Sequence, residues 1–346
     1  MPLRGNGQGF RRVFMASADS DQGHATRLDC LQVLRAVAAM AVVLFHCHWT
    51  GVASFGVELF FVISGFVICH AAARDPRHFL LKRIARVVPL YWLATFGVAL
   101  VALVAPALLP STQVSGLNLL RSLAFWPYQR GDGTDMPLLF LGWTLNYEAF
   151  FYVVFAVCLA ISTRLAPWLA LGLLVLATSL HGLVMPLGDP LDFWTRPILL
   201  NFACGIVVWL VWRKTRADLH RISPWVAGTV GLIAFAILVT GANHGVGGVL
   251  PSGGIVSGAL MLALLALSDR IRWPQALLLV GDASYSLYLL HPYVLQAVNR
   301  KIHAFGPDPR GVLATVLAVF AALALALVMF RVVERPSNRR LRRLIG

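Results

Sequence analysis

Charged residues are scarce in this sequence of 346 residues, of which 13% are Asp, Glu, Lys or Arg and 58% are hydrophobic. Soluble domains carry about 25% charged and about 45–50% apolar residues. The shortage of charge therefore excludes an ordinary soluble protein. It favours a chain whose long apolar segments are buried in a lipid bilayer.

Several chemical devices are also missing from the sequence. The five cysteines, an odd number without a CxxC pair, argue against a disulfide framework and against a metal site. No Gly-rich nucleotide loop, zinc motif or GxSxG elbow occurs, so catalysis by those means is not expected. Residues 1–29 lack the apolar core of a signal peptide and are expected to form a polar, disordered cytoplasmic tail.

Basic residues outnumber acidic ones, with 29 Lys and Arg against 15 Asp and Glu. A nucleic-acid-binding protein gathers such charge on one soluble face. In this chain the basic residues lie in short stretches between apolar segments, which is how membrane proteins hold loops on the cytoplasmic side. The pattern therefore predicts membrane lipid as a partner and no nucleic acid.

Runs of about 20 mostly apolar residues identify membrane-spanning helices. The sequence contains ten such runs, at residues 31–50, 54–73, 87–108, 138–161, 167–185, 195–212, 224–241, 252–268, 276–298 and 311–330. The predicted fold is therefore an all-α, polytopic integral membrane protein with about ten transmembrane helices. Residues 30–332 are expected to form the membrane domain.

The distribution of basic residues predicts the orientation of these helices. With a cytoplasmic N-terminus, the inner segments hold 22 of the 29 Lys and Arg residues and the outer segments hold six, while Arg35 lies within a span. This bias predicts that both termini are cytoplasmic and that the number of spans is even. Residues 333–346 are then a basic cytoplasmic tail.

Ionisable residues inside spans mark candidate functional sites, since each costs about 2.5–3.5 kcal/mol to insert. In the first span, Arg35 and His46 share a helix face and lie about 16 Å apart along the axis. His46 suits a general base, and Arg35 suits a phosphate or carboxylate. The alternative is an arginine that snorkels to the interface and a histidine bonded to a neighbouring helix. His48 is expected on a different face, at the interface.

Three acidic residues lie in other spans, namely Glu58, Glu148 and, in the ninth span, Asp282. Glu58, at the start of the second span, has a depth similar to that of His46. It could orient that imidazole, or it could be a solvated carboxylate favoured by the helix dipole. Glu148 lies near the middle of the fourth span, where a purely structural role would require a buried partner. The sequence favours a functional role for Glu148 and leaves Glu58 open.

Two further segments combine polar and apolar residues. Arg83 and Arg86, in the loop before the third span, could clamp an anionic cofactor such as the phosphates of coenzyme A. Without other information, the pair favours an anchor to anionic lipid.

Small and polar residues at 281–286 break the ninth span, which is tolerated only against protein or a wet cavity. This break is expected to line the same interior as His46, with His291 in a packing or hydrogen-bonding role.

Together these motifs resemble the membrane acyltransferase-3 family over about residues 28–336. The resemblance rests on six features in order: Arg35 with His46, GVELFFVISGFVI at 56–68, Arg83 with Arg86 before Pro89, WTLNYEAFFY at 143–152, GDASYSLYLLHP at 281–292 and Glu334-Arg335-Pro336. Within the family, the chain is similar in appearance to exopolysaccharide acetyltransferases of the succinoglycan type.

The resemblance implies an enzyme of the bacterial cytoplasmic membrane that transfers an acetyl or other short acyl group. The implied donor is acyl-CoA at the cytoplasmic side, as a co-substrate and not as a tightly bound cofactor. The implied acceptor is a hydroxyl of an exopolysaccharide or of its lipid-linked precursor. The expected site residues are the base His46, the carboxylates Glu148 and Glu58, and the donor-side residues Arg35, Arg83 and Arg86. Direct transfer and an acyl-enzyme both stay open.

A transporter or flippase of a polysaccharide precursor is the alternative, with the intramembrane charges as a proton relay. Transporters usually contain repeats between their halves, and none is found in this sequence. A purely structural partner in a synthesis complex would leave the buried Glu148 unexplained. The enzyme is therefore the preferred interpretation.

Overall fold

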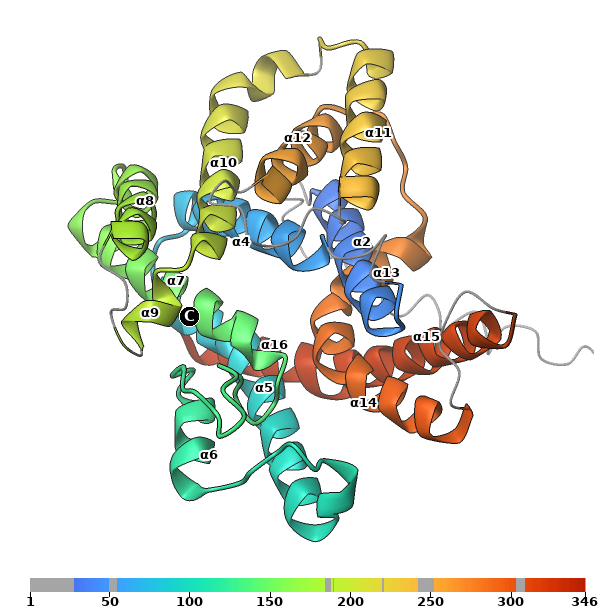
Figure 1. Cartoon of the computed structure of the whole chain (residues 1–346). Helices are drawn as coiled ribbons and strands as arrows, with labels where there is room; N and C mark the ends of the chain where they lie inside the picture. The colour runs from blue at the N-terminus through green and yellow to red at the C-terminus, as the bar shows by residue number, and fades with distance from the viewer. Residues whose placement is uncertain are drawn as a thin grey trace, which may run out of the picture.

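The computed structural model describes residues 28–49, 55–183, 188, 190–219, 221–241, 252–302 and 309–345. Within these ranges the chain forms helices and no strand, as Figure 1 shows. The predicted all-α fold is therefore confirmed. The predicted N-terminal tail lies almost entirely outside the described residues.

A helix or a pair of helices occupies each of the ten predicted spans. In chain order these are α2 (Asp29–His46), α4 (Gly56–Arg74), α5 (Phe79–Val104), α7 (Gly142–Ile161), α8 (Ala166–Leu183), α10 (Leu200–Leu219), α11 (Pro224–Gly241), α12 (Ser252–Ala266), α13 with α14 (Gln275–Asp282 and Ser284–Ile302) and α15 (Pro309–Met329). In the described part of the chain, seven helices are long and apolar enough to cross a membrane. The protein is therefore a multi-pass membrane protein, while the number of ten crossings stays a prediction.

Shorter helices connect or follow these elements. They are η1 (Pro106–Leu108), α6 (Gly116–Leu123), α9 (Leu191–Trp194), η2 (Pro197–Leu199), the π-helical turn η3 (Phe330–Glu334) and α16 (Arg335–Ile345). The basic C-terminal segment is thus helical, and α16 packs against α5.

A close helix crossing joins α4 to α10, where Gly65 meets Gly205. A Cβ atom added to Gly65 would lie 2.3 Å from the carbonyl oxygen of Phe202, and one added to Gly205 would lie 2.1 Å from that of Val62. Only glycine lets the two backbones approach this closely, and small residues serve membrane helix pairs in the same way. Because α4 also packs against α2, it lies between α2 and α10 (Figure 1).

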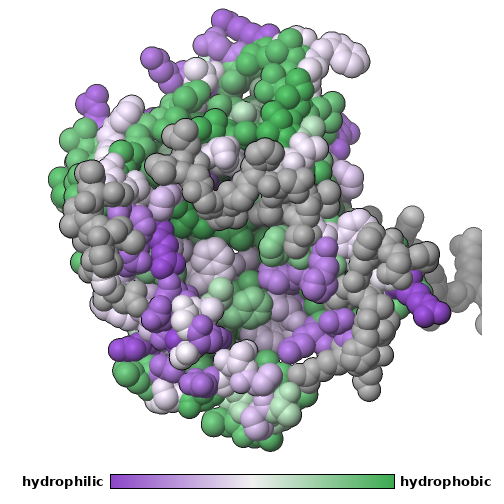
Figure 2. Space-filling view, in the orientation of Figure 1, coloured by the Kyte–Doolittle hydropathy of each residue, from purple (hydrophilic) through white to green (hydrophobic). Residues whose placement is uncertain are grey.

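Apolar side chains cover much of the outside of the molecule. Figure 2 shows hydrophobic residues over α8, α11 and α12 at the edge of this face, and hydrophilic residues across its middle. On α11, Leu232 is 72% exposed and Ile233 is 55% exposed. Exposing such a surface to water would be unfavourable, whereas contact with lipid acyl chains is not, because the chains are as apolar as these side chains.

The third predicted span differs from the structure at its start. α5 begins at Phe79 and not near residue 87, so Arg83 and Arg86 lie on a helix and not in a loop. Hydropathy marks where a helix is apolar, but Lys and Arg are good helix formers. The helix therefore extends beyond its apolar run, and its polar first turns carry the two arginines.

The ninth span is broken at Ala283, as the sequence predicted. α13 ends at Asp282 and α14 begins at Ser284. Gly281 lies against α2, because an added Cβ would be 2.1 Å from the carbonyl oxygen of Gln32. The break is thus packed against the first span, as an interrupted membrane helix requires.

Replacing Gly205 with alanine should destabilise the protein by about 1–3 kcal/mol, because the added methyl group overpacks the crossing with α4. Thermal unfolding of the purified protein in detergent measures this as a lower melting temperature. Gly172→Ala in α8 is the matched control, since an added Cβ there meets nothing within 4 Å. Equal melting temperatures for the two variants would contradict the close crossing.

Candidate functional site

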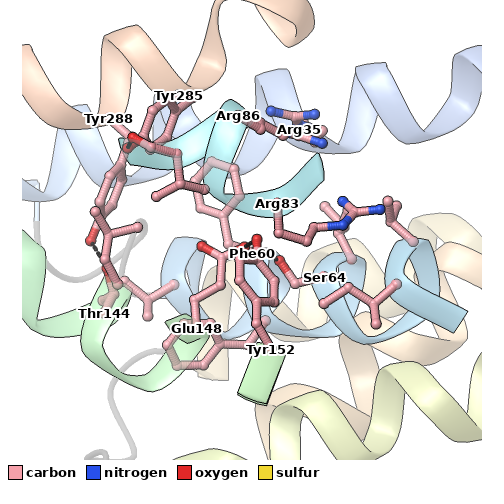
Figure 3. A pocket seen from close by; sticks show the side chains of 17 residues that line it. Arg35, Phe60, Ser64, Arg83, Arg86, Thr144, Glu148, Tyr152, Tyr285 and Tyr288 are labelled. Atoms are coloured by element: carbon pink, nitrogen blue, oxygen red, sulfur yellow. Dashed lines mark hydrogen bonds between the residues drawn. The ribbon is translucent and has the colours of Figure 1, made fainter. Parts of the chain in front are cut away.

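A cleft lined by arginines lies between α2, α4, α5, α7 and α14, and we call it the arginine cleft. Its polar lining residues are Arg35, Ser64, Arg83, Arg86, Thr144, Glu148, Tyr152, Tyr285 and Tyr288. Figure 3 shows Arg35 and Arg86 side by side, with Glu148 pointing into the cleft from α7. The structure thus brings together four of the six predicted site residues, which are Arg35, Arg83, Arg86 and Glu148.

Glu148 is held by two hydroxyl groups. Tyr152, one turn further along α7, donates a hydrogen bond to Oε1 of Glu148, and Ser64 of α4 donates another at 3.2 Å. Among the described residues, no hydrogen bond reaches Oε2, so this oxygen is available to a ligand in the cleft. The sequence analysis missed both partners, although the spacing of four residues between Glu148 and Tyr152 signals a contact on one helix face.

Three guanidinium groups give the cleft a net positive charge. Arg83 lies over the ring of Phe79, with its Cζ 5.6 Å from the ring centre, and its buried Nε has no hydrogen-bond partner among the described residues. In the same part of the chain, none of the three arginines forms an ion pair. Among the lining residues, three guanidinium groups thus accompany one carboxylate, and the cleft suits an anionic ligand.

The break in the ninth span supplies polar contacts around Arg35. Nε of Arg35 donates a hydrogen bond to Oγ of Ser284 at 3.1 Å. Oγ of Ser286 donates to Oε2 of Glu334 at 2.6 Å, and the hydroxyl of Tyr285 donates to a backbone carbonyl of α5 at 2.8 Å. Three consecutive residues therefore tie α14 to α2, to α5 and to η3 at the end of α15.

His46, the last residue of α2, lines a second cavity, which we call the histidine cavity. The polar residues that line it are His46, His48, Ser111, Thr112, Arg130, Tyr293, Gln296 and Asn299. The hydroxyl, amide and imidazole groups of these residues can form hydrogen bonds with a ligand that carries many hydroxyl groups. His48 lines the same cavity as His46, contrary to the spacing prediction, because α2 ends at His46 and the helical period no longer applies.

The hydrogen bonds of His46 determine which of its ring nitrogens is free. Nδ1 lies 2.8 Å from the carbonyl oxygen of Val42, and a carbonyl oxygen only accepts, so Nδ1 carries the proton. Nε2 of the neutral ring is then unprotonated and can act as a base. His291 has the same arrangement, with its Nδ1 3.0 Å from the carbonyl oxygen of Leu287.

His291 also contacts His46 directly. Its Nε2 lies 3.3 Å from Nδ1 of His46 and can accept from the same N–H group that bonds to Val42. His291 is fully buried, so its ring is fixed by packing. The predicted hydrogen-bonding role of His291 is confirmed. The break at 281–286 lies at the arginine cleft and not at the histidine cavity, which is lined by later residues of α14, because the two ends of this span reach different depths of the bundle.

Tyr288 lies beside His291, which in turn contacts His46. It lines the arginine cleft, and its ring centre lies 6.4 Å from that of His291. Its hydroxyl is 2.7 Å from Oγ1 of Thr144, a contact drawn at one side of the cleft in Figure 3, and its ring packs on Phe60 at 5.7 Å. Tyr288 and His291 therefore form a chain of side-chain contacts from the cleft to His46.

Glu58 lies at a different place. Among the described residues it lines neither the arginine cleft nor the histidine cavity. Its carboxylate meets the first turn of α12, where a Cβ added to Gly253 would lie 1.7 Å from Oε2. Glu58 also lies in the first turn of its own helix α4, and a carboxylate at a helix N-terminus is favoured by the helix dipole. A catalytic role for Glu58 stays a prediction.

The apolar helices define a multi-pass membrane protein, and these helices enclose a charged cleft and a polar cavity. The sequence matches the acyltransferase domain of the acyltransferase-3 family over residues 28–331. The chain therefore belongs to this family, as its motifs predicted.

Two relatives show how far the likeness extends. The chain is 34% identical to the exopolysaccharide production protein ExoZ of Rhizobium meliloti, over 86% of this chain and 95% of ExoZ. It is 24% identical to the peptidoglycan O-acetyltransferase OatA of Listeria monocytogenes, over 88% of this chain and 55% of OatA. No solved structure matches the chain.

Two substitutions test the hydrogen bond from His291 to His46 separately from its hydrogen bond to Leu287. His291→Asn keeps an amide near the position of Nδ1 but removes the acceptor that faces His46, whereas His291→Gln places a carbonyl oxygen near the position of Nε2. If His291 orients His46, His291→Asn should lower kcat for acyl transfer about 10²-fold with little change in the KM of the donor. His291→Gln should recover most of that loss. Steady-state kinetics measures both values, and equal losses would indicate packing alone.

Proposed function

We propose that this protein is a membrane O-acyltransferase, which moves an acetyl or other short acyl group from acyl-CoA to a hydroxyl of an exopolysaccharide or its lipid-linked precursor. One observation carries the proposal. A single helix, α2, contributes Arg35 to a positively charged cleft and His46 to a polar cavity, and Tyr288 of the cleft lies beside His291, which contacts His46. This arrangement suits an anionic donor at one end and a polyhydroxyl acceptor at the other.

The arginine cleft supports acyl-CoA as the donor. Coenzyme A carries phosphate groups, and planar guanidinium groups bind phosphates through paired hydrogen bonds. The distribution of basic residues favours ten spans with both termini in the cytoplasm, and this orientation supports a cleft that faces the cytoplasm, where acyl-CoA is made. Acyl-CoA then acts as a co-substrate, and no tightly bound cofactor is proposed. Glu148, with its free Oε2, is the carboxylate that would contact the donor.

His46 supports the acceptor side as a general base. Its Nε2 takes the proton of a sugar hydroxyl while the hydroxyl oxygen attacks the carbonyl carbon of the thioester. The carbon–sulfur bond then breaks, and the coenzyme A thiolate leaves and takes up a proton. The printed names of ExoZ and OatA, which refer to exopolysaccharide production and to peptidoglycan O-acetylation, also support a polysaccharide acceptor.

A transporter or flippase of a polysaccharide precursor is the second candidate, because charged groups lie inside the spans. Membership of an acyltransferase family argues against it. So does the lack of a repeat between the two halves of the sequence, which transporter folds usually contain.

Replacing His46 with alanine should remove O-acetyl groups from the surface polysaccharide while the polymer is still made and exported. Loss of a general base lowers a rate by about 10²–10⁴-fold. The measurement is the acetyl content of polysaccharide purified from cells that carry the wild type, His46→Ala or the control His78→Ala, an exposed histidine before α5. Normal acetylation with His46→Ala would refute the enzyme, and loss of export with normal acetylation would favour transport.

Arg83→Ala and Arg86→Ala should each raise the KM of acetyl-CoA by roughly tenfold or more, because a hydrogen bond to a charged group is worth about 1.5–3 kcal/mol. The KM of the acceptor should change little. Arg164→Ala, at an exposed arginine between α7 and α8, is the control.

The same assay in sealed vesicles tests from which side of the membrane acetyl-CoA reaches the protein, since acetyl-CoA does not cross a bilayer. Added acetyl-CoA should support transfer in inside-out vesicles only. An unchanged KM in both cleft variants, or transfer in right-side-out vesicles, would exclude a cytoplasmic acyl-CoA site at these arginines.

A further inference from the structure

An apolar groove runs along the outside of the molecule between α5 and α14, and we call it the α5–α14 groove. It is continuous with the histidine cavity, because both are lined by Val98, Leu109, Tyr293 and Gln296. Apart from Tyr293 and Gln296, the groove is lined by aliphatic side chains, glycine, alanine and Met329. An apolar passage therefore leads from the surface of the molecule to the polar cavity that contains His46.

The groove opens sideways, where lipid would surround the protein. On α5, Leu93 is 48% exposed and Val101 is 39% exposed. Gly97 lies between them, and a Cβ added there would meet nothing within 4 Å. An apolar molecule can therefore enter the groove from the plane of the bilayer, while its polar end reaches the histidine cavity.

The length of the groove favours a long hydrocarbon chain. It is lined by Leu90 at one end and Val101 further along α5, a distance of about 16 Å by helical rise, and it continues past the helix to Leu109. Half of a hydrocarbon core of about 30 Å is about as long as the part of the groove along α5. The groove therefore accommodates a hydrocarbon chain that spans at least the depth of one leaflet, while its continuity with the histidine cavity holds the polar end at His46.

We propose that the acceptor is a saccharide still attached to a long-chain lipid carrier, with the chain in the α5–α14 groove and the sugar hydroxyl at His46. This inference rests on the proposed transferase function and selects between the two acceptors that it left open. A free polymer has no apolar part, so it would make no use of the groove. The transfer step is unchanged: the hydroxyl proton goes to His46, the new oxygen–carbon bond forms, and the carbon–sulfur bond of the donor breaks.

The experiment compares two forms of one acceptor. Lipid-linked saccharides are extracted in organic solvent from membranes of cells that lack this protein, and half of the sample is freed of lipid by mild acid. Purified full-length protein in lipid nanodiscs then receives radiolabelled acetyl-CoA with either form. We expect a kcat/KM for the lipid-linked form at least about tenfold higher, as burial of a few methylene groups in an apolar site can provide.

Substitutions that fill the groove should remove this preference. Gly97→Phe places a ring in the open space on α5, and Ala297→Phe does so from α14 on the opposite wall. Gly172→Phe on α8 is the matched control, because its added side chain also meets open space but lies outside the groove. The ratio of the two kcat/KM values should fall about tenfold in either groove variant and stay unchanged in the control.

The other outcomes each have a distinct meaning. Equal use of both forms by the wild type, or groove variants that behave like Gly172→Phe, would show that the groove holds only bulk lipid and would overturn the inference. Transfer to neither form, in a strain whose polymer is acetylated, would place the reaction on the finished polymer and overturn it as well. If deletion of the protein leaves the acetyl content of the polymer unchanged, the proposed function itself fails.

Discussion

Arg35 is a guanidinium group inside an apolar bundle, and its hydrogen bond to Ser284 ties the first span to the break in the ninth. The break leaves polar groups that need partners of their own, and Ser286 finds one in Glu334. Charged and polar groups are tolerated at this depth only against protein or a wet cavity. The helices that satisfy them must therefore surround a common interior, so the cost of burying polar groups shapes the arginine cleft.

The cleft and the histidine cavity divide two kinds of chemistry between the ends of α2. The cleft combines three guanidinium groups and a carboxylate with hydroxyl groups, whereas the cavity around His46 offers hydroxyl, amide and imidazole groups and one guanidinium group. Tyr288, held by Thr144 and Phe60, lies beside His291, which contacts His46.

The apolar groove along α5 adds a third approach, from within the bilayer. An enzyme that receives an anionic donor from one aqueous side and a lipid-held sugar from the membrane needs no large opening between its two aqueous faces. The packing at Tyr288 and the close contact of α4 with α10 at Gly65 and Gly205 agree with such an enzyme, because they keep the helices tightly packed. The two substrates would then meet inside the protein without a continuous pore.

The sequence by itself determined the helical class, the ten apolar segments, the break near Ala283 and the buried charges Arg35 and Glu148, because hydropathy, helical period and the cost of a buried charge are local properties. Arg83 and Arg86 were assigned to the donor side only by the resemblance to the family. The sequence could not determine contacts between helices. His291 and His46 are 245 positions apart, and only packing brings Nε2 of one to Nδ1 of the other. Packing also placed Glu58 against α12 and put Tyr288 beside His291. Spacing along one helix defines a face, whereas the partner of that face is decided by how the helices cross.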